Sequence, residues 1–262
     1  MASIGIIGVG EIGRALVTGL QDTNSPPHVW LSPRNAPTAS ALSAQFEAVR
    51  VCADNQEVVD HSQIVVISVR PSDQDAALDG LRISREKTVI NVMAGVFNDD
   101  LRRRLSTEAA IVRAIPLPAV SQCQAITVVS PSHPQVNELF DQLGGSLPVA
   151  SEDELNVFSA LTATLSTQYR YLTTTAAWAV SQGLSTEAAD RYVRGLFQGI
   201  GRALEDRSHT LDELAARHET PNGINHRIRT TWFDEANVGA LTSALDELLA
   251  SLSPPKRGTT CD

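Results

Sequence analysis

The chain has 262 residues and a mass of 28.1 kDa, which suits one large domain or two of moderate size. Its formal net charge of −9 and isoelectric point near 5.1 argue against binding to nucleic acid or to an anionic membrane, because both carry negative charge. The three cysteines are scattered and form no C-x-x-C pair, so we expect a reduced, cytoplasmic protein without disulfides or a zinc site.

Neither a membrane span nor a metal centre is expected. No apolar run is both long enough and free enough of charge to cross a bilayer, and the apolar N-terminus lacks the basic leader of a signal peptide. The six histidines are dispersed, without the H-E-x-x-H spacing of a zinc enzyme.

The most informative stretch lies at the N-terminus. An Ile-rich run over residues 3–8 leads into a G-x-G-x-x-G motif, and a helical pattern follows; the motif is Gly8-Val9-Gly10-Glu11-Ile12-Gly13. In this motif the first glycine allows a tight turn, the second lets the backbone approach a pyrophosphate, and the third lets the helix pack on the strand. A plain surface turn is the alternative, but the strand before it and the helix after it favour dinucleotide binding. We therefore predict that residues 8–13 hold coenzyme phosphates at a helix N-terminus.

In dinucleotide-binding folds, the residues that contact the ribose end of the coenzyme lie about twenty residues beyond the glycines. An NAD site would carry an acid there, but this chain has none between His28 and Asn35. It offers the donors Ser32, Arg34 and Asn35 instead, and the planar guanidinium of Arg34 suits a phosphate. We predict NADP(H), although Arg34 as an ordinary solvated charge stays the alternative.

The first half of the chain alternates between strand and helix signals. The expected strands are 3–8, 28–32, 48–52, 64–69, 88–92, 110–115 and 125–130. Most are short Val/Ile runs without clean alternation, which is typical of strands buried on both faces. The pattern predicts an α/β fold with a Rossmann-type doubly wound sheet over residues 1–150. Ligands of such sheets bind at the carboxyl ends of the strands, so we expect coenzyme contacts just after Val69, Val92 and Ile115.

After residue 150 the pattern becomes helical. A capping box at Ser151 and Glu154 opens a series of apolar residues that predicts one long helix ending before Gly183. Further helices are expected from Ser185, from Thr210, and over 224–252 with a break near 237–239. Small residues along the long helix suggest an interlocked homodimer; a monomeric helical bundle is the alternative. We therefore predict an all-α substrate and dimerisation domain over 151–252 and a disordered tail over 253–262.

The best candidate for a substrate site is a polar loop that runs straight into a helix. Its residues are Thr220-Pro221-Asn222-Gly223-Ile224-Asn225-His226. A helix N-terminus suits a carboxylate, and Thr220 and Asn225 add side-chain donors, although a capped helix start without a ligand is an equal alternative.

The choice of reaction depends on the proton donors available. The only lysines are Lys87 and Lys256, outside the helical domain, which favours reduction of a C=N bond, whose nitrogen arrives already protonated, over reduction of a ketone. Tyr169, Tyr171 and His226 are possible acids, but such residues on helices are more often packing or solvated groups.

These motifs resemble the pyrroline-5-carboxylate reductase family across nearly the whole chain. The residues that carry the likeness are the glycine turn, Ser32-Pro33-Arg34-Asn35, Asp54-Asn55, Val69-Arg70-Pro71, Val89–Val96 and Val112–Pro116. The resemblance implies an NADPH-dependent reductase of a cyclic imino acid that works as an interlocked dimer. It also implies coenzyme contacts by Asn55, Val69, Arg70, Pro71, Ala94 and Gly95.

On the substrate side, the resemblance implies that Thr220, Asn222, Gly223, Ile224 and Asn225 bind the substrate carboxylate, with Thr220 and Asn225 in the catalytic position. Three departures from the family lie at this end. The turn after Ile115 lacks an Asn-Thr pair, residues 161–167 match poorly, and Asn225 stands where the family has threonine. Three hypotheses stay open: pyrroline-5-carboxylate reduction, reduction of another imine or carbonyl compound, and a non-catalytic NADP(H)-binding protein.

Overall fold

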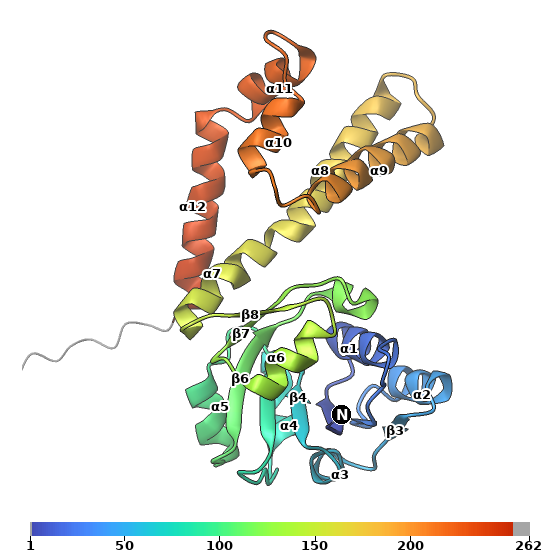
Figure 1. Ribbon diagram of the computed structural model, residues 1–262, viewed down its shortest axis with the longest axis vertical. Helices are drawn as coiled ribbons and strands as arrows, with labels where there is room; N and C mark the ends of the chain where they lie inside the picture. Colours follow the sequence, from blue (N-terminus) through green and yellow to red (C-terminus); the bar gives the residue numbers. More distant parts are fainter. Residues whose placement is uncertain (1, 254–262) are drawn as a thin grey trace, which may run out of the picture. The chain divides into compact units, whose positions relative to one another are not determined.

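The computed structural model describes residues 2–253 (Figure 1). The chain divides into two compact units, residues 1–158 and 159–262. The roles predicted for residues 1–150 and 151–252, and the boundary between them, stay predictions. The predicted disordered tail lies, from residue 254 onward, outside the described residues.

The first unit contains one sheet with the strand order β3-β2-β1-β4-β5-β6-β7-β8. β1 is parallel to its two neighbours β2 and β4, the parallel pairing continues from β4 to β6, and β7 runs antiparallel to β6. The bounds are β1 Ile4–Ile7, β2 Val29–Leu31, β3 Val49–Val51, β4 Ile64–Ile67, β5 Thr88–Asn91, β6 Ala110–Ile115, β7 Thr127–Ser130 and β8 Ser146–Pro148. The predicted doubly wound fold is confirmed.

Helices cover both faces of this sheet. Alternate residues of β4 point to opposite sides, so Ile64 and Val66 belong to one apolar cluster and Val65 and Ile67 to the other. The first cluster packs under α1 Glu11–Gln21, α2 Ala36–Gln45 and α6 Pro134–Asp141. The second packs under α3 Asn55–Asp60, α4 Gln74–Leu78 and α5 Asn98–Leu105. Burial on both faces explains the unbroken Val/Ile runs.

Two short 3-10 helices complete the unit, η1 Pro71–Asp73 and η2 Pro118–Gln122. All seven predicted strands exist, but the sequence did not reveal β8. This strand lies at the sheet edge, Leu147 within it is exposed, and Pro148 removes a backbone donor, so it lacks the apolar pattern of a buried strand.

The described residues of the second unit form helices joined by short loops, and none of them lies in a strand. The helices are α8 Thr164–Ser181, α9 Thr186–Ala203, α10 Leu211–Arg217, α11 Ile224–Trp232 and α12 Glu235–Leu252, while α7 Glu152–Thr162 begins in the first unit. Gly183, with φ +97°, follows the end of α8 as predicted.

Two helix predictions were wrong. The single long helix is divided at Ala163, where the flanking Thr162 and Thr164 hydroxyls donate to carbonyls three residues back and compete with the helix ladder. The break expected at 237–239 lies instead at residues 233–234. There the Asp234 carboxylate accepts from the Asn237 N–H at 3.0 Å and caps α12, which places residues 237–239 inside the helix.

Cys52, directly after β3, allows a chemical test of the core. Burial raises the pKa of its thiol to about 11, with further contributions from Glu57 and Asp54. We expect Cys52 in a Cys123→Ser/Cys261→Ser variant to react with a thiol reagent at pH 8 about two orders of magnitude more slowly when folded than when unfolded, since the thiolate is the reactive form. Equal rates in buffer and in denaturant would contradict the burial of this side chain.

Candidate coenzyme and substrate sites

The three glycines of the N-terminal motif have different surroundings. Gly8 has φ +99°, and a side-chain carbon there would lie 2.8 Å from the Ser68 carbonyl. A side-chain carbon at Gly13 would lie 2.5 Å from the Gly8 oxygen, whereas one at Gly10 would meet nothing within 4 Å. Gly8 and Gly13 are therefore required by packing, and Gly10 faces open space.

The open space at Gly10 adjoins the start of α1. Gly10 is the N-cap residue and makes no side-chain capping hydrogen bond. The first-turn acid, Glu11, pairs with Arg14 at 3.5 Å and is exposed. An eleven-residue helix with an uncapped N-terminus offers N–H donors and the positive end of its dipole, so this position can hold a phosphate.

The loop after β2 is tied to the glycine turn. The buried Ser32 hydroxyl accepts from the Gly8 N–H at 3.0 Å, and the Asn35 amide donates to the Val9 carbonyl at 2.8 Å. Asn35 has φ +65°, a conformation that Asn tolerates better than most residues. These two predicted phosphate donors thus support the turn itself, whereas Arg34 between them is exposed and pairs with Asp73 at 3.3 Å.

The other predicted coenzyme residues follow neighbouring strands. Val69 is half-buried after β4, Arg70 is exposed, and Pro71 begins η1. After β5, Ala94 and Gly95 are exposed, and Gly95 has φ +72° with open space at its missing side chain. The Asn55 amide at the start of α3 donates to the Ala77 carbonyl at 2.9 Å. The parallel sheet brings these loops to one edge, but their contact with coenzyme stays a prediction.

Sequence reasoning missed two residues that build this edge. The Ser68 hydroxyl donates to the Gly8 carbonyl at 2.5 Å and so joins the end of β4 to the glycine turn. The buried Asn91 amide donates to the Val96 carbonyl at 2.8 Å, and its oxygen accepts from the Met93 N–H at 3.1 Å. The sequence feature that could have revealed Ser68 and Asn91 is a polar residue at or directly after the end of an otherwise apolar strand.

A buried ion pair lies next to the loop after β5. Arg113 of β6 is 2% exposed, and its guanidinium lies 3.4 Å from the Glu152 carboxylate at the start of α7. Glu152 also accepts from the Asn98 N–H at 3.2 Å, and Arg113 lies over the Phe97 ring at 5.0 Å from its centroid. Burial raises the pKa of Glu152 and lowers the pKa of Arg113, and the attraction between the pair opposes both shifts.

In the second unit, the predicted substrate loop forms a tight turn. The Gly223 N–H donates to the Thr220 carbonyl at 2.8 Å, Asn222 has φ +61°, and a side chain on Gly223 would clash with the Thr220 hydroxyl. Gly223 is the N-cap of α11 without a side-chain capping bond, and Ile224 after it is 82% exposed. The predicted helix start is confirmed.

Two contacts fix this turn. The Asn225 amide donates to the His218 carbonyl at 2.7 Å, and Arg229 forms a bidentate pair with Glu219. The hydrogen bond from Arg229 lowers the pKa of Glu219. One of the two N–H groups of the Asn225 amide is therefore engaged within the loop. The other N–H, the Thr220 hydroxyl and the helix N–H groups are the donors that a ligand could use.

The candidate proton donors differ in their surroundings. Tyr171 stacks on Trp232 at 5.2 Å and meets the edge of Phe197 at 5.7 Å, which is a packing role. Tyr169 is exposed, and His226 is half-buried in the first turn of α11. The Lys87 ammonium donates to the Val59 and Ser62 carbonyls at 2.7 and 2.6 Å, so this lysine is structural.

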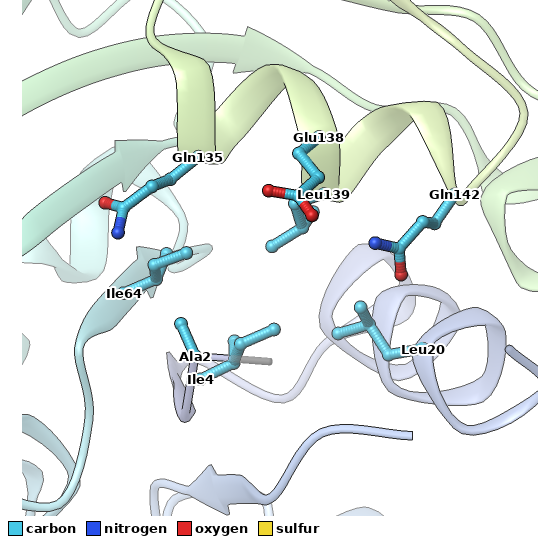
Figure 2. A pocket seen from close by; sticks show the side chains of 8 residues that line it. All are labelled: Ala2, Ile4, Leu20, Ile64, Gln135, Glu138, Leu139 and Gln142. Carbon is cyan, nitrogen blue, oxygen red and sulfur yellow. The ribbon is translucent and has the colours of Figure 1, made fainter. Parts of the chain in front are cut away.

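A small cavity lies near the amino ends of β1 and β4, whereas the glycine turn follows the carboxyl end of β1 (Figure 2). Gln135 and Glu138 of α6, and Gln142 directly after this helix, point toward apolar side chains on the other side of the cavity. Those side chains are Ala2, Ile4, Leu20 and Ile64, and Leu139 of α6 also lines the cavity. Its volume of about 120 Å³ is too small for a dinucleotide, and it lies away from the glycine turn.

Within residues 2–253, no three His, Cys, Asp or Glu side chains gather as a metal site would require. None of the helices in the same range is long and apolar enough to cross a membrane.

Comparison with known proteins finds relatives that share sequence with this chain. Residues 3–95, which contain the glycine turn and the first five strands, match the family described as NADP oxidoreductase, coenzyme F420-dependent. Pyrroline-5-carboxylate reductase 2 of Bacillus subtilis is 22% identical over 252 residues, which cover 91% of each chain. Pyrroline-5-carboxylate reductase 1 of Dictyostelium discoideum is 28% identical over 131 residues, which cover 48% of this chain and 23% of that longer protein.

Two crystal structures share the fold. The 1-pyrroline-5-carboxylate reductase of Streptococcus pyogenes superimposes with a TM-score of 0.81 at 20% identity, over 96% of this chain and 98% of that one. The Plasmodium falciparum pyrroline carboxylate reductase with NADP bound has a TM-score of 0.76 at 18% identity, over the same shares.

Proposed function

Because the chain belongs to the pyrroline-5-carboxylate reductase family, we propose that it is an NADP(H)-dependent oxidoreductase that reduces the C=N bond of a cyclic imino acid, of the pyrroline-5-carboxylate type. The observation that carries this proposal is the glycine turn. Gly8 and Gly13 are sterically required, while Gly10 leaves the uncapped start of α1 open to a phosphate. The family relationship and the geometry of the glycine turn both support a dinucleotide coenzyme of the NADP(H) class.

The residues at the carboxyl edge of the sheet fit NADP(H). The open space at Gly10 supports placing the pyrophosphate there, and the exposed Arg34 supports a 2′-phosphate at the ribose end, where no acid occupies the strand end. Ala94 and Gly95 present little side chain after β5, so a flat ring could approach the backbone there. When bound, the reduced coenzyme supplies a hydride.

On the substrate side, the turn before α11 supports binding of a carboxylate. We assign the anion to the N–H groups at the start of α11, with the Thr220 hydroxyl as donor and Asn225 beside it in the catalytic position. Asn222 and Ile224 would border the bound molecule. No lysine lies in the described part of this unit, which favours a substrate whose imine nitrogen arrives already protonated.

The assay that tests this function is steady-state oxidation of NADPH with pyrroline-5-carboxylate. We expect turnover that depends on both compounds, and a Thr220→Val variant should lose substrate affinity while its coenzyme affinity stays unchanged. Turnover only with other cyclic imines or ketoacids would support the second hypothesis, reduction of another imine or carbonyl compound. Tight NADPH binding without turnover on any of them would leave a non-catalytic coenzyme-binding protein.

Assembly as a homodimer in the cytoplasm is part of the proposal. Among the described residues of the second unit, the buried apolar side chains are only Ala160 and Ala189. Large apolar side chains stand exposed instead: Tyr169, Trp178, Leu184, Tyr192, Leu196, Leu211, Ile224 and Ile228. An apolar surface of this extent calls for a partner, and a second copy would cover it in a closed, symmetric assembly.

The dimer gives a prediction with a matched control. Light scattering at micromolar concentration should give twice the chain mass for the wild type, and Leu196→Asp on α9 should shift the mass toward the monomer, because a charge cannot be buried there without cost. Leu147→Asp, which replaces an exposed leucine of the first unit, should keep the dimer mass. A wild-type mass equal to one chain would overturn the dimer.

A further inference from the structure

Arg34, the residue expected to bind the coenzyme's 2′-phosphate, forms an ion pair with Asp73. The Arg34 guanidinium lies 3.3 Å from the Asp73 carboxylate, and the two side chains are 56% and 34% exposed. In the described part of the chain, neither residue has another ion pair. The cation expected to hold a phosphate therefore already has an anionic partner within the protein.

The pair joins two loops on either side of the phosphate turn. Arg34 follows β2 and Asp73 ends η1, which follows β4, and these two strands are the neighbours of β1 in the sheet. The backbone on each side of Arg34 is fixed to the turn through Ser32 and Asn35. A phosphate that reaches Arg34 must therefore approach within a few ångströms of Asp73.

The chemistry of the two anions decides which one Arg34 binds. A single, exposed carboxylate contact is a weak interaction, whereas a phosphate is close to doubly charged and has three acceptor oxygens for the guanidinium fork. The phosphate can therefore replace Asp73, but the displaced carboxylate stays nearby and repels it. A coenzyme without the 2′-phosphate meets no such repulsion, because it leaves the ion pair intact.

We propose that Asp73 is a specificity-determining residue: it competes with the coenzyme's 2′-phosphate for Arg34 and so reduces the protein's preference for NADPH over NADH. The proposal rests on the proposed function, because it requires NADP(H) at this site. It concerns a residue that does not itself hold the coenzyme.

The test is Asp73→Asn in the full-length protein, which removes the charge and keeps the shape. Titration calorimetry at low ionic strength should show the NADPH dissociation constant fall about threefold to tenfold and the NADH constant stay within about twofold. Raising the salt to about 0.5 M should reduce the gain, because the repulsion is screened. The matched control is Asp75→Asn, since Asp75 lies two residues further on and pairs with Arg104 of α5 instead. It should leave both constants unchanged.

Three results would overturn the proposal while the wild type still binds NADPH. One is an Asp73→Asn affinity equal to that of Asp75→Asn; another is an equal gain for NADH and NADPH. The third is weaker NADPH binding by Asp73→Asn, which would make Asp73 a support for Arg34. Failure of the wild type to bind NADPH would instead remove the proposed function.

Discussion

Replacing Gly10 by alanine should weaken coenzyme binding strongly and leave the fold intact. The added methyl group would meet no protein atom within 4 Å, so we expect little change in the free energy of unfolding. The same methyl group would occupy the space through which a pyrophosphate reaches the start of α1, so NADPH affinity should fall by roughly 100-fold or more, about 2.7 kcal/mol. Thermal unfolding and NADPH titration on the same sample measure the two effects.

The contrast with Gly8 sharpens this test. Gly8→Ala would force a side chain onto φ +99° and to within 2.8 Å of the Ser68 carbonyl, so it should lower both the melting temperature and the NADPH affinity. Gly10→Ala should affect the affinity alone. If Gly10→Ala bound NADPH as the wild type does, the turn would not be the phosphate site and the proposed coenzyme role would fail.

The second large effect is expected at the buried ion pair. Glu152→Ala would leave the Arg113 guanidinium, which is 2% exposed, without its carboxylate. Removal of one partner of a buried pair costs about 3–5 kcal/mol, and the partial exposure of Glu152 places our expectation near the lower end, at about 3 kcal/mol. Chemical denaturation should show this as a lower midpoint for the first unit.

Two variants act as controls for the buried pair. Asp153→Ala removes the next acid on the same helix turn, which is exposed, and should change the stability by less than about 0.5 kcal/mol. The double variant Arg113→Met/Glu152→Leu removes both charges together and should recover most of the loss, because no charge is then left buried alone. A Glu152→Ala protein as stable as Asp153→Ala would show that Arg113 finds adequate solvation elsewhere.

The parts of the fold that sequence reasoning reached are those with a local cause. Short Val/Ile runs predicted most of the seven strands because both faces of the central strands are buried. The spacing of Gly8, Gly10 and Gly13 predicted the turn because a strand and a helix must meet there. Thr210 and Glu213 form the reciprocal capping box that their spacing predicts. Such signals lie within a few residues of one another.

What the sequence could not reveal depends on partners far along the chain. Ser68 supports a turn sixty residues earlier, and Arg34 meets Asp73 only because β2 and β4 flank β1. The residue types of Ser32 and Asn35 predict phosphate donors, but their side chains bond to the glycine turn, which only the folded loop shows. The division of the helix at Ala163 likewise depends on hydroxyl rotamers that an apolar pattern does not specify.

The hydrogen bonds from Gly8 to Ser32 and from Asn35 to Val9 have a consequence for changing the coenzyme by mutation. Since they tie the loop after β2 to the glycine turn, we expect that exchanging residue 32 or 35 would also disturb the proposed pyrophosphate site at the start of α1. A library that seeks an NADH-selective variant should therefore vary Arg34 and Asp73 together and keep their flanking neighbours constant.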